Sequence, residues 1–146
     1  SGYPETMAEE AFAVFYRVRN EVVLYDDARP ALERLHGRFR LFAVSNGNAD
    51  LAAIGIAGYF ERALAARDAG MLKPDPRIFA LLLEQAGLDA ARALHVGDDA
   101  VADVEGARRA GVTPVWLNRS GKRWSVAASP PPLTVRTLLE LAELLE

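Results

Sequence analysis

The sequence predicts an α/β protein, with a Rossmann-like parallel sheet between two layers of helices. Three short apolar runs, residues 40–44, 93–96 and 113–117, have the length and composition of buried parallel strands. Segments with helical spacing separate them, and this alternation is typical of a three-layer α/β/α fold. Polar clusters follow the first two runs, and binding sites in such sheets lie at the carboxyl ends of the strands.

Length and composition favour one globular domain and exclude several functional classes. The 146 residues, 51% of them hydrophobic, suffice for one core but not comfortably for two. A net charge of −3 argues against a nucleic-acid-binding surface, and the apolar runs are too short to span a bilayer. Cysteine is absent, which excludes disulfides and thiol catalysis and leads us to expect a cytoplasmic protein.

The first segment, residues 4–25, is predicted to form one amphipathic helix. Phe12, Phe15, Val18 and Val22 recur at helical spacing along it. Aromatic residues at this spacing usually belong to a core, although they could also stack on a ligand.

The rest of the chain alternates between the two kinds of element. Asp75 is the expected N-cap of one helix, Pro76 its first residue, and Gly87 its end. The predicted helices are residues 30–36, 49–54, 76–86, 104–110 and 133–146, and the predicted strands are residues 40–44, 61–66, 93–96 and 113–117.

A first polar cluster follows the strand at residues 40–44. Ser45 offers a hydroxyl, and Asn46 and Gly47 offer backbone N–H groups at the start of a helix. Such groups bind phosphate oxygens, so we expect a phosphate-binding loop here. An ordinary strand-to-helix turn is the alternative, because it uses the same residue types.

Lys73 is the second candidate. Arginine supplies 15 of the 17 basic residues, so a lysine in this chain is unusual. Pro74 restricts Lys73 to extended geometry, which aims its ammonium group before the next helix begins. Lys73 is therefore expected to neutralise carboxylates and phosphate oxygens, with a solvated loop lysine as the alternative.

The third cluster follows the strand at residues 93–96. Gly97 permits a tight turn, Asp98 stands at the strand end, and Asp103 falls in or beside the first turn of the next helix. Converging carboxylates are the ligands that Mg²⁺ prefers, so Asp98 and Asp103 are the predicted metal ligands. An N-cap with solvated acids is the alternative. His95, in mid-strand, is predicted to be a packed core residue, and His36 to be solvated.

In this order, the three clusters resemble motifs of the haloacid dehalogenase (HAD) superfamily of hydrolases. LFAVSN is similar to the second motif, KPDP to the third and HVGDDAVAD to the fourth. The resemblance implies a HAD-like core in which Ser45 binds phosphate and Lys73 steadies nucleophile and phosphate. It makes Asp98 a Mg²⁺ ligand and Asp103 a supporting carboxylate. SNGN, HVGDD and VWLNR resemble the branch of flavin-mononucleotide and ribitylaminouracil-phosphate phosphatases.

The first motif of that superfamily is absent. It is an Asp-x-Asp-Gly whose first aspartate attacks phosphorus and whose second acts as general acid and base. Asp26 lacks this spacing and is rejected as the nucleophile. We therefore expect this chain to be the C-terminal part of a longer enzyme and to have no activity by itself. Residues 1–25 would be the end of a helical cap domain, and residues 26–146 would belong to the core.

The motif's strand lies centrally in the family's sheet, so we expect that strand to be missing here. Two unpaired buried edges would remain, and they favour a domain-swapped homodimer or association with the missing N-terminal piece. The resemblance implies a Mg²⁺-dependent phosphomonoester hydrolase acting on a small phosphorylated metabolite. The alternatives are a 2-haloacid dehalogenase and a non-catalytic Mg²⁺-binding or interaction module.

Overall fold

Six parallel strands form a single sheet in the computed structural model, which describes residues 13–17, 25–46 and 51–146. The strand order is β3-β2-β1-β4-β5-β6, and each neighbouring pair is parallel. The strands are β1 (Ala13–Arg17), β2 (Arg40–Ser45), β3 (Arg62–Ala65), β4 (Ala93–Gly97), β5 (Thr113–Leu117) and β6 (Leu133–Val135). The helices and helical turns are α2 (Ala28–His36), α3 (Leu51–Ile54), η1 (Ala57–Tyr59), α4 (Ala66–Ala69), α5 (Pro76–Ala86), η2 (Ala90–Arg92), η3 (Ala100–Glu105), α6 (Gly106–Arg109) and α7 (Leu138–Leu144).

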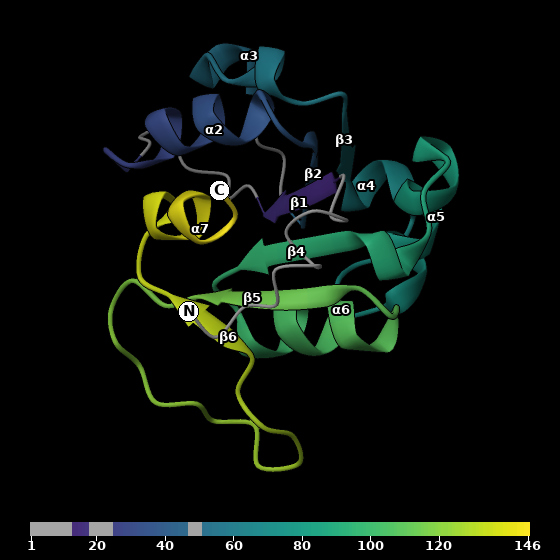
Figure 1. Cartoon of the computed structure of the whole chain (residues 1–146). Coiled ribbons are helices and arrows are strands. Elements are labelled where there is room, and N and C mark those ends of the chain that lie inside the picture. The colour runs from purple at the N-terminus through teal and green to yellow at the C-terminus, as the bar shows by residue number, and fades with distance from the viewer. Residues whose placement is uncertain (1–12, 18–24, 47–50) are drawn as a thin grey trace.

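Helices cover both faces of the sheet, as the sequence predicts (Figure 1). On one face α2 and α7 pack over Leu41 and Ala43 of β2. On the other face α5 and α6 pack over Phe42 and Val44. The continuous apolar run of β2 follows from this two-sided burial. None of the helices among the described residues has the length and apolar character needed to cross a membrane.

The predicted helix over residues 4–25 is wrong at Ala13–Arg17, which form β1. This strand pairs with β2 on one side and β4 on the other, so the expectation of an empty central position is also wrong. The physical reason is that pairing satisfies backbone groups of two neighbouring strands, which outweighs a helical spacing of side chains. Residues 4–12 and 18–24 of the predicted helix lie outside the described residues.

The predicted helix over residues 133–146 is wrong at its start, where β6 pairs with β5. The helix α7 begins only at Leu138, because the Thr137 hydroxyl accepts a hydrogen bond from the Glu140 backbone N–H. The helix predicted over 104–110 begins earlier, at Ala100, as a π-helical segment followed by α6. Of the helix predicted over 49–54, residues 51–54 form α3, and 49–50 lie outside the described residues.

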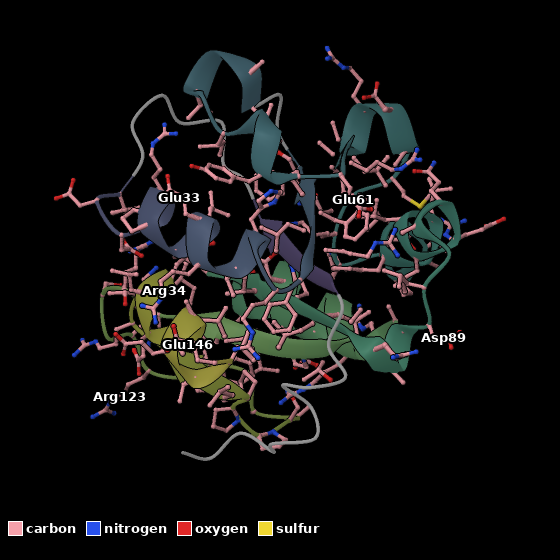
Figure 2. The ribbon with its side chains drawn as sticks, turned by 45° about the horizontal axis from the view of Figure 1, so that its top comes forward. Glu33, Arg34, Glu61, Asp89, Arg123 and Glu146 are labelled. Carbon is pink, nitrogen blue, oxygen red and sulfur yellow. The ribbon has the colours of Figure 1, made fainter. Side chains whose placement is uncertain are left out.

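Local capping signals are confirmed where the sequence is explicit. The Asp75 side chain accepts the Arg77 N–H ahead of α5, and Gly87 ends that helix with a left-handed φ of 69°. The Arg77 guanidinium and N–H hydrogen bonds lower the pKa of Asp75 to about 2. Figure 2 shows Arg34 of α2 beside Glu146, with which it forms an ion pair.

Asp27 joins three separate parts of the chain. Its carboxylate accepts hydrogen bonds from Arg119 Nη1 at 2.7 Å and from the Leu138 backbone N–H at 2.7 Å. The Arg119 guanidinium also lies 3.9 Å from the centre of the Tyr25 ring. Burial raises the pKa of Asp27, but the hydrogen bonds from Arg119 and Leu138 outweigh it and hold the pKa below its ordinary value of 3.8. The turn before α2, the segment after β5 and the start of α7 are thus fixed together.

Replacing Asp27 with asparagine is expected to lower the free energy of unfolding at pH 7 by about 1–3 kcal/mol, because a charged hydrogen-bond acceptor is lost. A group whose pKa is lowered by folding stabilises the protein above its unfolded pKa and loses that effect as the pH falls through the folded pKa. The difference between wild type and Asp27→Asn should therefore shrink below pH 3.8. Urea unfolding from pH 7 downwards measures it, and a pH-independent difference would contradict this account.

Candidate active site

The predicted site residues gather at the edge of the sheet where the strands end. Ser45 is the last residue of β2 and is buried, and Asp98 follows β4 and is half-buried. Both strands are parallel to β1 between them, so their carboxyl ends lie at the same edge. Gly47 lies outside the described residues.

Asn46 holds Lys73 through its side chain. The Asn46 Oδ1 accepts the Lys73 backbone N–H at 3.0 Å, and Nδ2 donates to the Lys73 carbonyl oxygen at 3.3 Å. The amide therefore pairs with both backbone polar groups of one residue, as a neighbouring strand would. This fastens the loop before α5 to the end of β2. Sequence reasoning considered only the backbone N–H of Asn46 and missed this contact.

Lys73 and Asp103 form a buried ion pair. Lys73 Nζ lies 2.8 Å from Asp103 Oδ1, and both side chains are 0% exposed. The alternative of a solvated loop lysine is therefore wrong. A buried charge is tolerated only when it is paired and hydrogen-bonded, so this contact fixes the loop before α5 relative to η3.

Asp103 also binds two further donors. His95 Nε2 lies 2.9 Å from Asp103 Oδ1, and the Asp99 backbone N–H donates to Oδ2 at 3.0 Å. His95 is fully buried, as predicted, and packs edge-on against Phe79. Its hydrogen bond to Asp103 was not predicted; the only sequence signal is its place two residues before the Gly97-Asp98 turn.

Gly97 and Gly106 make room for this arrangement. A Cβ at Gly97 would lie 2.2 Å from Asp103 Cγ, and one at Gly106 would lie 3.0 Å from Pro74 Cα. Such distances forbid a side chain at 97 and crowd one at 106. The close approach of strand end, helix and lysine loop therefore depends on these two glycines.

The fit of a Mg²⁺ ion can be judged from the available oxygen donors. Among residues 13–17, 25–46 and 51–146, no three His, Cys, Asp or Glu side chains converge into a metal-binding group. However, Mg²⁺ is usually held by one or two carboxylates, with water and substrate phosphate as the other ligands. Asp98 offers a carboxylate at the strand end, and Asp103 contacts Lys73, His95 and Asp99. These residues fit a Mg²⁺ ion shared with substrate better than a closed protein cage.

Comparison with known families agrees with this geometry. Residues 3–111 match the family model of haloacid dehalogenase-like hydrolases. The chain belongs to this family. Two of its relatives are phosphatases: a phosphoserine phosphatase of Thermus thermophilus, 38% identical over 96% of this chain and 58% of the relative, and the Escherichia coli 5-amino-6-(5-phospho-D-ribitylamino)uracil phosphatase YigB, 33% identical over 75% and 46%.

Solved structures of HAD-like proteins share the fold. A 2-haloacid dehalogenase from Pseudomonas syringae superposes with a TM-score of 0.80 at 40% identity, covering 84% of this chain and 53% of the other. The magnesium-bound HAD-hydrolase YfnB from Bacillus subtilis gives 0.79 at 28% identity, covering 86% and 57%. The chain thus spans about half the length of these two proteins and of the two phosphatases.

Replacing Lys73 with methionine should lower the free energy of unfolding by about 3–5 kcal/mol, because Asp103 would stay buried without its cation. Asp103→Asn keeps the shape of the side chain but only one of its two acceptor oxygens, so it should destabilise through the unpaired ammonium group and the loss of one hydrogen bond from His95 or the Asp99 N–H. The double variant should lose less than the sum of the two single losses, by about 1–3 kcal/mol. Urea unfolding of all four proteins measures this coupling, and additive losses would contradict a buried pair.

Proposed function

We propose that this chain carries the phosphate- and Mg²⁺-binding part of a phosphomonoester hydrolase that acts on a small phosphorylated metabolite. The observation that carries the proposal is the buried Lys73–Asp103 pair, set beside Ser45 and Asp98 at one edge of a HAD-like sheet. The Thermus and Escherichia relatives are both phosphatases of small metabolites, which supports the substrate class. The narrower branch around YigB is also part of this proposal.

Ser45 and Lys73 would handle the phosphoryl group. The Ser45 hydroxyl, with the backbone N–H groups of Asn46 and Gly47, would orient phosphate oxygens, and the Lys73 ammonium would stabilise the negative charge of the transition state. Preorganisation supports this role for Lys73, because Asn46 fixes its backbone and Asp103 its ammonium group. The charge therefore needs no rearrangement when substrate arrives.

Asp98 would hold the Mg²⁺ ion, which when bound offsets charge on the transferring phosphoryl group. For Asp103, the contacts with Lys73, His95 and the Asp99 N–H favour the supporting role over direct metal binding. Asp103 would thus orient Lys73 and the turn that carries Asp98. The two carboxylates, predicted together as ligands, would then have different tasks.

The 146 residues contain no Asp-x-Asp pair, and β1, which occupies the central sheet position, carries no aspartate. Asp26 is exposed in the turn before α2, and Asp27 is engaged with Arg119 and Leu138. The chain alone is therefore proposed to bind but not to turn over substrate. The division into a cap end at residues 1–25 and a core at 26–146 is wrong for residues 13–17, because β1 lies within the core sheet, and stays a proposal for the rest. The domain-swapped dimer loses its argument, because β1 fills the gap.

A 2-haloacid dehalogenase is the second candidate, favoured by the 40% identity to the Pseudomonas enzyme. Carbon–halogen hydrolysis on this scaffold requires no metal, so a carboxylate at Asp98 argues for the phosphatase. A non-catalytic module is the third candidate, and it need not bind phosphate at all. Metal and phosphate binding therefore separate the three.

We expect the chain to bind Mg²⁺ in the presence of inorganic phosphate, and Asp98→Asn to weaken that binding by about tenfold or more. Asp89→Asn is the matched control: Asp89 is exposed, precedes β4 at the opposite end from Asp98 and lies at the periphery in Figure 2. Its affinity should equal that of wild type. Isothermal titration calorimetry measures both, and equal binding by all three proteins would contradict a role for Asp98.

With Mg²⁺ and p-nitrophenyl phosphate, the chain alone should release no nitrophenol above the buffer rate. A longer protein that joins this chain to an Asp-x-Asp strand should release nitrophenol and leave chloroacetate intact, as a chloride assay would show. Chloride release would instead establish the dehalogenase. Turnover by the 146 residues alone would show that a nucleophile lies within them.

A further inference from the structure

Trp116 contacts the backbone of the proposed metal ligand. Its indole Nε1–H donates to the Asp98 carbonyl oxygen at 2.9 Å. Trp116 lies in β5 opposite Gly97, the last residue of the neighbouring β4, and Asp98 directly follows Gly97. Trp116 is 5% exposed, so its ring is fixed by packing. One side chain of the sheet thus fastens the first residue beyond β4.

A second tryptophan covers the first. The Trp124 and Trp116 ring centres lie 5.2 Å apart with an interplanar angle of 73°. Trp124 lies in the long connection between β5 and β6, which extends away from the sheet in Figure 1. Its own Nε1–H donates to the Ser129 carbonyl oxygen at 2.8 Å, within the same connection. The cover excludes water from Trp116, and a hydrogen bond is stronger where the local dielectric is low.

The turn after β4 is fastened from both sides. On one side the Asp99 N–H bonds to Asp103, and on the other the Asp98 carbonyl bonds to Trp116. Both contacts hold the single peptide group that joins Asp98 to Asp99, so they fix the backbone on the carboxyl side of the Asp98 Cα, from which the side chain extends. Groups that orient a metal ligand in this way raise metal affinity, because the ligand need not be ordered on binding.

We propose that Trp116 is a positioning residue for Asp98, and that its indole N–H sets the affinity of this edge of the sheet for Mg²⁺ in the presence of phosphate. The inference rests on the proposed function, in which Asp98 holds the metal. It assigns a role to a residue that does not touch metal or substrate.

Trp116→Phe deletes the indole donor and keeps an aromatic ring. We expect it to weaken Mg²⁺ binding by about tenfold in calorimetry with inorganic phosphate. Trp124→Phe is the matched control, because it deletes an indole donor directed at Ser129 and keeps a ring over Trp116. Its Mg²⁺ affinity should stay within about twofold of wild type. Far-UV circular dichroism confirms that both variants are folded.

The chain contains two tryptophans, so its nitrogen-15 NMR spectrum has two indole N–H signals, and Trp124→Phe leaves that of Trp116 alone. This signal should move during the Mg²⁺ titration with the midpoint found by calorimetry, which a role in packing alone would not produce. This titration tests the positioning role of Trp116 even if the Trp116→Phe variant fails to fold.

The outcomes separate the two proposals. If wild type and Trp116→Phe bind Mg²⁺ equally, or if the Trp116 signal does not move, the positioning role is wrong and the proposed function stands. If wild type binds no Mg²⁺ with phosphate, both proposals fail together.

Discussion

The arrangement of this edge of the sheet depends on one buried ion pair. Lys73, in the loop before α5, and Asp103, in η3, are 30 residues apart in the sequence, and both side chains are inaccessible to water. Neither charge is tolerable there without the other, so the loop before α5 and the helical segment after β4 must close on one another. The Asn46 side chain also hydrogen-bonds the Lys73 backbone, and His95 and the Asp99 N–H hydrogen-bond the Asp103 carboxylate. The pair thereby positions Ser45 and Asp98 as well.

Elements with local signals could be predicted from the sequence, and elements made by their neighbours could not. The strands β2, β4 and β5 are predicted by their apolar runs. The helix α5 is predicted by its N-cap Asp75, by Pro76 at its first position and by Gly87 at its end. By contrast, β1 and β6 are strands because unpaired edges of β2, β4 and β5 accept them. The spacing of side chains in β1 and β6 does not reflect this pairing, so their sequences alone favour a helix.

The same distinction applies to the site. The residue types at 45, 73, 98 and 103 indicate their chemistry, because hydroxyl, ammonium and carboxylate groups at strand ends suit phosphate and metal. The sequence does not distinguish the tasks proposed for Asp98 and Asp103, since only the fold shows that Asp103 is held by Lys73, His95 and the Asp99 N–H. Hydrogen bonds from side chain to backbone, such as those of Asn46 with Lys73 and of Trp116 with Asp98, depend on strand register. No sequence motif predicts them.

Gly97 determines the order in which the residues of such a site can be replaced during evolution. Any side chain at position 97 would occupy the space of the Asp103 carboxylate, so it would evict Asp103 and strand Lys73. Loss of the lysine and the carboxylate, on the other hand, would open that space and release position 97 to vary. In a decaying copy of this fold, the charged residues would therefore have to go first and the glycine only afterwards.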